Sequence, residues 1–309
     1  MIRSMYSGIS GLKNFQTKLD VIGNNIANVN TYGFKKGRTV FKDLISQTTS
    51  GASGATATTG GINAKQVGLG SQLAAIDTIH SGGSLQSTGN TLDLAISGDG
   101  FFAVANGNGT TPTGFSNIEY TRAGNFYMDA KGYLVNSDGK YVYGYADDTA
   151  ATAADTTFMD AKDAVGMITN TAGTLPTTPP TGTTLKPIRI PTNAQSMSIG
   201  QDGTVTFVDS AGTLKYAGQL ILVKFPNPGG LEKTGGNYYT GSSNSGNPFY
   251  SSATEQGMGS VNSGFLEMSN VDLSEEFTDM IVAQRGFQAN TRIITTSDSI
   301  LEELINLKR

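Results

Sequence analysis

"LSEEFTDMIVAQRGFQANTRIITTSDSILEELINLKR", residues 273–309, is the most regular stretch of the chain. Alternating steps of four and three residues select one helix face, and most of the selected positions are apolar. These positions are Leu273, Phe277, Met280, Gln284, Phe287, Thr291, Ile294, Asp298, Leu301 and Ile305. Asp272, with Glu275 three residues later, is typical of a helix start. Lys308 and Arg309 suit the negative end of a helix, so we expect one helix about 50 Å long.

A second amphipathic helix is predicted at the other end of the chain, over residues 4–29. Its apolar positions lie near a heptad seam, and they are Met5, Ile9, Leu12, Leu19, Ile22, Ile26 and Val29. Asn24, Asn25 and Asn28 interrupt this helix, although asparagine competes for backbone hydrogen bonds and is poor in a helix interior. Gly33 follows as a stop signal.

The two terminal helices are expected to pack together, antiparallel or crossing, because neither can hide its apolar stripe alone. The alternative is that they pack on the rest of the chain or form an ordinary two-helix hairpin. Polar side chains within the stripes favour assembly, because amides in a seam fix the register between helices. The candidate subunit-assembly residues are Ile9, Leu12, Leu19, Ile22, Asn25, Ile26, Asn28, Val29, Leu273, Phe277, Met280, Gln284, Phe287, Ile294, Leu301 and Ile305.

The middle of the chain changes to period-two patterns separated by turn signals, which predicts strands. Turns are expected around Asp99, at Asp129–Gly132, and at the dipeptides Asp138-Gly139 and Asp202-Gly203. The predicted fold class is therefore α+β, with a mainly-β middle flanked by long terminal helices that pair like a coiled coil.

Four regions are predicted from composition and pattern. Residues 1–30 and 270–309 form the helical domain, and residues 71–146 with 185–269 form the β-rich domain. Residues 31–70 read as an extended connector, in which 48–61 contains only Gly, Ala, Ser and Thr and is either a hinge or a passive loop. Residues 147–184, rich in Thr and Ala, are an insertion or a small outer subdomain.

Composition excludes several function classes. The net charge of −4 and the pI near 5.1 argue against a nucleic-acid partner, which requires a basic face. Thiol chemistry is excluded because the chain has no cysteine. The N-terminal residues lack the apolar run of a cleaved signal, and no stretch is long and apolar enough for membrane insertion.

Catalytic and metal sites are also poorly supported, so no enzyme activity, cofactor or metal is expected. His80 is the only histidine and is expected on the surface or in a turn. Paired carboxylates could serve hydrolysis, but Asp99 and Asp129 lie in turns where Asp is common. Residues 129–140 lack the ligand pattern of a calcium loop. Lys35, Lys36 and Arg38 are expected to form a solvated or subunit-contacting basic face.

Three stretches carry a family resemblance. "LDVIGNNIANVNTYGFKKGRTVF" (residues 19–41) resembles the N-terminal signature of the bacterial flagellar axial proteins, the rod and hook family. "STGNTLDLAISGDGFFAV" (87–104) is similar to the central motif of that family, and residues 269–309 are similar to its C-terminal signature. Within the family, residues 1–36 most resemble hook proteins of Gram-positive bacteria, and the insertion 147–184 favours the hook over the shorter rod subunits.

This resemblance implies an extracellular subunit of the flagellum, exported unfolded through the flagellar type III apparatus without a cleaved signal. The subunits are expected to polymerise with themselves into a short curved tube, a universal joint that transmits torque from rod to filament. Expected partners are rod proteins, hook–filament junction proteins and the hook cap during assembly. The alternatives are the distal rod protein, a rigid drive shaft, and a secreted β-rich adhesin, which leaves the terminal helices unexplained.

Overall fold

The computed structural model describes residues 2–56, 58–107, 115–146 and 185–307. It divides the chain into two compact units. The helical unit comprises Met1–Val29, Lys36–Ile79 and Val271–Arg309, and the β unit comprises Asn30–Lys35 and His80–Asn270. The predicted insertion 147–184 lies outside the described residues.

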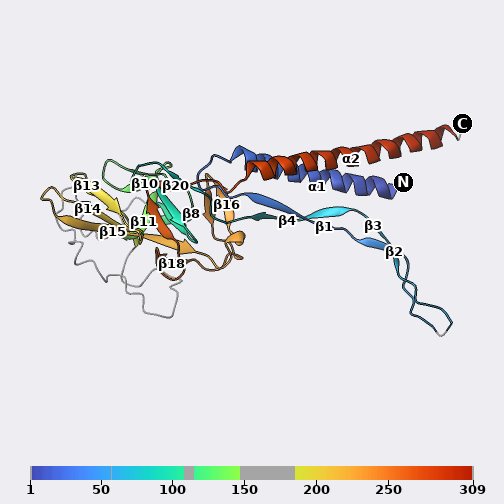
Figure 1. The fold of residues 1–309 in the computed structure, drawn as a ribbon, viewed down its shortest axis with the longest axis horizontal. Coiled ribbons are helices and arrows are strands. Elements are labelled where there is room, and N and C mark those ends of the chain that lie inside the picture. Colours follow the sequence, from blue (N-terminus) through green and yellow to red (C-terminus); the bar gives the residue numbers. More distant parts are fainter. Residues whose placement is uncertain (1, 57, 108–114, 147–184, 308–309) are drawn as a thin grey trace. The chain divides into compact units, whose positions relative to one another are not determined.

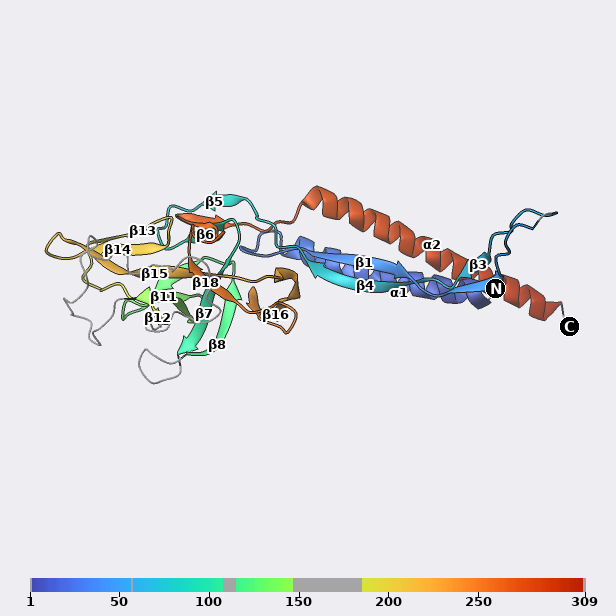
Figure 2. The same cartoon turned by 90° about the horizontal axis from the view of Figure 1, so that it is seen from below.

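Two long helices form the helical unit and lie side by side (Figures 1 and 2). Helix α1 spans Ile2–Ala27 and helix α2 spans Leu273–Asn306. Helix α2 begins where the sequence predicted, because the Asp272 carboxylate accepts hydrogen bonds from the backbone N–H groups of Ser274 and Glu275. Helix α1 begins and ends two residues earlier than predicted. None of the helices in the described part of the chain is long and apolar enough to cross a membrane.

A long β-ribbon completes the helical unit. Strand β1 (Gly37–Asp43) pairs antiparallel with β4 (Ser71–Thr78), and β2 (Ser46–Ser50) pairs with β3 (Lys65–Gly68). A further bridge joins Ser53 to Ile62. Backbone hydrogen bonds therefore extend into residues 48–61, the part of the extended connector that was predicted to be a hinge or a passive loop. Small side chains do not prevent this, because the ladder bonds come from the backbone.

The β unit is built on one antiparallel sheet of twelve strands, in the central order β13-β14-β15-β11-β7-β8-β17-β16. Its members are β7 (Phe101–Gly107), β8 (Phe115–Thr121), β9 (Phe126–Met128), β10 (Leu134–Asn136), β11 (Tyr141–Ala146), β12 (Leu185–Pro187), β13 (Ser196–Ile199), β14 (Thr204–Val208), β15 (Leu214–Lys224), β16 (Glu232–Gly235), β17 (Tyr238–Thr240) and β18 (Phe249–Ser252). Two small sheets pair β6 (Leu94–Ser97) with β19 (Ser260–Ser263) and β5 (Leu85–Ser87) with β20 (Phe265–Glu267).

The central strands β7 and β15 of the large sheet are buried on both faces. Along β7, Phe102 and Val104 belong to one apolar cluster, whereas Phe101 and Ala103 belong to a second cluster. Strand β15 alternates in the same way, with Leu222 in the first cluster and its neighbours in the second. Because successive side chains of a strand point to opposite faces, the two clusters are two cores.

The predicted turns occur where the sequence placed them. Asp129–Gly132 connects β9 to β10, Asp138-Gly139 connects β10 to β11, and Asp202-Gly203 connects β13 to β14. Gly139 and Gly203 have φ angles of 76° and 81°, in the left-handed region that favours glycine.

The compact units divide the chain differently from the domains expected from composition. Residues 71–78 belong to the helical unit because β4 pairs with β1, although the sequence pattern assigned them to the β-rich domain. Residues 30–35 belong to the β unit, where the backbone N–H of Gly33 donates to the carbonyl of Glu267 at 2.8 Å.

Replacing Gly124 by alanine is expected to destabilise the β unit. A Cβ atom there would lie 1.6 Å from the carbonyl oxygen of Leu94, and backbone atoms cannot move aside cheaply. We expect a loss of about 3 kcal/mol in the free energy of unfolding, measured by urea titration. Gly82→Ala is the control, because nothing lies within 4 Å of its Cβ position. Equal stability of the two variants would contradict this packing.

Candidate functional site

Small residues allow α1 and α2 to approach closely. A Cβ atom on Gly286 would lie 2.5 Å from the Cζ atom of Phe15, and one on Gly8 would lie 3.4 Å from Ile294. Gly8 near Ile294 and Phe15 near Gly286 also show that the helices are antiparallel, since α2 numbers fall as α1 numbers rise. The close contact therefore depends on glycine. Many larger apolar side chains of α2 lie outside this contact and are exposed.

The buried line of α2 differs from the predicted seam by about one residue. Glu276, Ala283 and Ser297 are buried at multiples of seven residues. Of the predicted seam, Met280, Ile294 and Leu301 are half-buried. The other seven positions are exposed, and they are Leu273, Phe277, Gln284, Phe287, Thr291, Asp298 and Ile305. The apolar pattern alone could not distinguish the side that faces α1 from sides that face other molecules.

Most of the predicted positions on α1 are buried or half-buried. Ile22 and Asn25 are buried, and Ile9 is exposed. The remaining predicted positions are half-buried, and they are Leu12, Leu19, Ile26, Asn28 and Val29.

Asn25 joins three elements of the helical unit. Its side-chain Nδ2 donates to the carbonyl of Gly37 at 2.9 Å and to Glu276 Oε1 at 3.2 Å, while its Oδ1 accepts from the Gly37 N–H at 2.9 Å. Asn25 thus connects α1 to the start of β1 and to α2. This explains an asparagine in a helix interior, because its amide matches the unpaired backbone groups at the start of a strand.

Two ion pairs within the helical unit add little to its stability. Lys18 Nζ lies 3.2 Å from Asp279, and Lys36 Nζ lies 2.7 Å from Glu275, but both carboxylates are well exposed to solvent.

Burial raises the pKa of Glu276, and the hydrogen bond from Asn25 opposes this shift.

Large apolar side chains remain exposed along two lines of α2. Leu273, Phe277 and Ile281 follow at four-residue steps and are called flank A. Val282, Ile293 and Ile300 are separated by three and two helical turns and are called flank B. The six side chains are between 40% and 59% exposed. Flanks A and B lie on opposite sides of the buried line.

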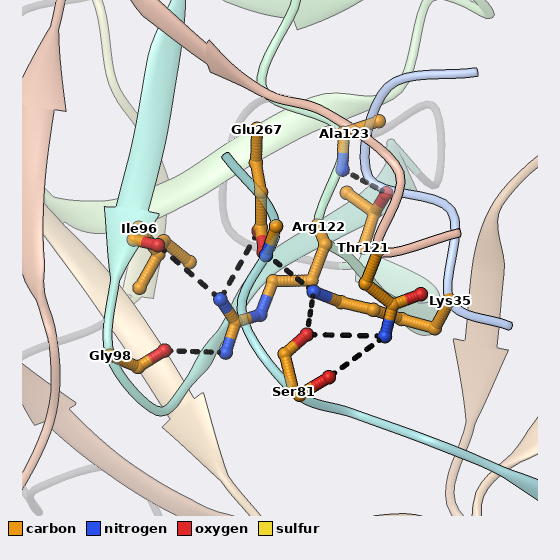
Figure 3. A network of polar contacts seen from close by, with 10 residues as sticks. Lys35, Ser81, Ile96, Gly98, Thr121, Arg122, Ala123 and Glu267 are labelled. Atoms are coloured by element: carbon orange, nitrogen blue, oxygen red, sulfur yellow. Dashed lines mark hydrogen bonds and ion pairs between the residues drawn. The ribbon is translucent and has the colours of Figure 1, made fainter. Parts of the chain in front are cut away.

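The β unit contains a buried ion cluster, defined as Lys35, Arg122 and Glu267 (Figure 3). Glu267 Oε1 lies 2.5 Å from Lys35 Nζ, and Glu267 Oε2 lies 3.2 Å from Arg122 Nη1. Arg122 also donates to the carbonyls of Ile96 and Gly98. Desolvation lowers the pKa of Lys35, and the Glu267 carboxylate opposes this shift.

The ion cluster gathers chain segments that are distant in sequence. Lys35 Nζ donates to the carbonyl of Ser81 at 2.8 Å, and the backbone N–H of Gly83 donates to Glu267 Oε1 at 3.0 Å. Sequence reasoning missed this cluster, because no motif spacing links its three members. Lys35 was expected on a basic face, but it is fully buried because Glu267 supplies the compensating charge.

His80 is half-buried, and its two ring nitrogens are inaccessible to solvent. Its ring packs edge-on against Phe101 and Tyr239, with centroid distances of 5.5 and 5.4 Å. Burial lowers the pKa of His80 from 6.5 to about 4, and the charges of Lys35 and Arg122 act in the same direction.

The carboxylates that sequence analysis weighed as catalytic groups serve local structure. Asp129 Oδ1 accepts from the N–H groups of Lys131 and Tyr133 in a turn, and Asp99 forms an ion pair with Lys224.

Comparison with known proteins matches three parts of the chain to family models. These are the flagella basal body rod protein family at residues 5–35, the flagellar hook protein FlgE/F/G D1 domain at 95–207, and the flagellar basal body rod FlgEFG protein C-terminal family at 262–307.

Curated relatives match along the whole chain. The flagellar basal-body rod protein FlgG of Bacillus subtilis is 53% identical over 313 residues, covering 100% of both chains. The flagellar hook protein FlgE of Borreliella burgdorferi is 33% identical over 449 residues, again covering 100% of both. The crystal structure of the Helicobacter pylori flagellar hook protein FlgE2 matches with 14% identity and a TM-score of 0.39, over 59% of this chain and 100% of that chain.

Glu267→Gln is expected to destabilise the β unit strongly. The change leaves two buried cations, Lys35 and Arg122, without their anion, and breaking a buried pair in this way costs about 3–5 kcal/mol. Urea unfolding at neutral pH measures the loss. Glu232→Gln, at an exposed position of β16, is the control and should change stability by less than about 0.5 kcal/mol. A similar small loss in both variants would show that the ion cluster is not structural.

His80→Phe is expected to reduce the acid sensitivity of the β unit. Between pH 6.5 and 4 the unfolded chain binds a proton at His80 and the folded chain does not, so stability falls as the pH falls through this window. This contribution is about 2–3 kcal/mol. Urea titrations at pH 7 and pH 4 should show a drop that is smaller by this amount in the variant, whose ring keeps the aromatic contacts. An identical drop would mean that His80 is solvated in the folded protein.

Proposed function

This chain belongs to the family of bacterial flagellar rod and hook proteins, and from that premise we propose that it is a subunit of the distal rod. Members of this family are structural components of the flagellum and not enzymes. In the proposed role, the subunits polymerise into a straight tube that acts as a drive shaft between the motor and the hook.

The full-length similarity to a rod protein carries this proposal. The rod relative aligns with 53% identity over 313 residues, close to the 309 residues of this chain. The hook relatives are 33% and 32% identical, and their alignments extend over 449 and 473 residues. Hook proteins of that kind contain long segments that this chain lacks. The insertion 147–184, which favoured the hook in the sequence analysis, fits within the length of a rod protein.

The helical unit supplies the surface for self-assembly. Flanks A and B differ from each other and lie on different sides of α2, so flank A of one copy can bind flank B of the next. A contact between two different surfaces does not close on itself in a pair, and its repetition builds a helical polymer. We place the paired helices in the inner tube and the β units in the outer layer.

Further partners follow from this position. The two ends of the polymer contact other rod and hook proteins, and the export apparatus and a cap protein act during assembly. Export through a narrow type III channel requires an unfolded chain, which agrees with terminal helices that depend on assembly for stability.

Antibody labelling of isolated flagella with attached basal bodies tests the proposal. An antibody against the β unit should label the straight segment between the basal body and the curved hook. Label along the curved segment would assign the protein to the hook instead. Absence of label from both segments would exclude an axial subunit.

Phe277→Asp is expected to block self-assembly and leave the monomer folded. Phe277 is half-exposed in the monomer, but in the polymer its replacement would be a buried, unpaired carboxylate costing several kcal/mol. Sedimentation of concentrated protein measures assembly, and urea unfolding checks the β unit.

The control is Gln16→Asp, which adds the same charge at an exposed position of α1. This position belongs to neither flank A nor flank B, so the control should still sediment. Normal sedimentation of Phe277→Asp, or equal loss in both variants, would count against flank A as the contact.

A further inference from the structure

The positions of apolar and charged side chains along α2 bear on how far neighbouring copies are shifted along the polymer axis. The inference rests on the proposed self-assembly and concerns the partner that covers flanks A and B. In a helical polymer every copy points the same way along the axis, so the α2 helices of neighbouring copies run in parallel.

The two apolar flanks are centred at different heights along α2. Flank A is confined to the first part of the helix, with Phe277 at its centre. Flank B extends from Val282 to Ile300, with Ile293 near its centre. Two parallel copies that are level with each other would therefore bring flank A against only one end of flank B. A shift of about 15 residues, or about 22 Å, aligns the two centres.

Charge along α2 varies in three blocks. The first block is acidic, the second is basic and the third is acidic again. Their exposed or half-buried members are Asp272, Glu275 and Asp279, then Arg285 and Arg292, and finally Asp298, Glu302 and Glu303. Lys18 and Lys36 neutralise part of the first block through their ion pairs, so its net charge stays negative.

The charge blocks select the same shift as the flanks. In level copies, each block would face the block of its own sign. A shift of about 13 residues places the first acidic block beside Arg285 and Arg292 of the neighbour, and places those arginines beside the final acidic block. This shift is about 20 Å. Charges at the rim of such a contact interact within a screening length of about 8–10 Å.

We propose that the partner of flank A is flank B of a second, parallel copy, shifted by about 20 Å along the helix axis. The shift has one sign only, because a shift in the other direction would place flank A beyond the start of the neighbour's α2. Apolar area supplies the attraction, and the charge blocks exclude the level arrangement.

Cross-linking tests the shift directly, since the wild-type chain contains no cysteine. Full-length Ile281→Cys and Ile293→Cys chains, carrying tags of different size, are mixed, assembled and oxidised. These two positions are 12 residues apart, so neighbours with the proposed shift bring them together. The control mixture combines Ile281→Cys with Val282→Cys, which meet only between level copies.

We expect the cross-linked heterodimer to form at least about fivefold more in the first mixture, because cysteines whose Cα atoms lie more than about 7 Å apart cannot be bridged. Equal or greater cross-linking in the control mixture, with normal sedimentation, would overturn the shift and leave self-assembly intact. Failure of wild-type chains to sediment would instead overturn the proposed function.

A charge-reversal variant tests the contribution of the blocks. Arg285→Glu with Arg292→Glu makes α2 acidic throughout, and we expect at least about a fivefold rise in the concentration needed for sedimentation, reduced at high salt. The matched control reverses Arg3 and Lys13, two exposed cations of α1. An equal effect of both double variants would show that net charge, and not the block order of α2, controls assembly.

Discussion

The close antiparallel contact of α1 with α2 determines which side chains of the helical unit remain for other molecules. Because glycine and other small residues make this contact, the two helices need few large apolar side chains between them. Ile22 and Ala283 are the only buried apolar side chains of this unit among the described residues. The larger side chains of flanks A and B are thus left on the outside.

The two units are stabilised in different ways. The β unit has an apolar core on each face of its large sheet and a buried ion cluster, so it can fold without a partner. The helical unit has polar contacts such as those of Asn25, together with ion pairs that are worth little in water. Isolated helices gain little from propensity alone. The helical unit therefore has less internal stabilisation than the β unit.

Local signals in the sequence predicted the local structure well. The carboxylate of Asp272 capped α2 as expected, and the Asp-Gly dipeptides formed the predicted turns, because neighbouring residues determine such features. Features that depend on distant residues were not predictable. Lys35 looked like a solvated lysine until Glu267 was placed beside it, and Asn25 looked unsuited to a helix until Gly37 was found against it. The seam of α2 was displaced by about one residue, because periodicity reports apolar faces without naming the molecule that covers each one.

The ion cluster lies near the points at which the chain passes from one unit to the other. The chain passes between the two units four times, after Val29, Lys35, Ile79 and Asn270. On the β side of these points, hydrogen bonds and ion pairs to Glu267 fix residues 33–35 and 81–83. An apolar contact would allow them to slide past one another, whereas a buried ion pair with defined geometry loses several kcal/mol on separation. Glu267 thus holds these segments, which are distant in sequence, together within the β unit.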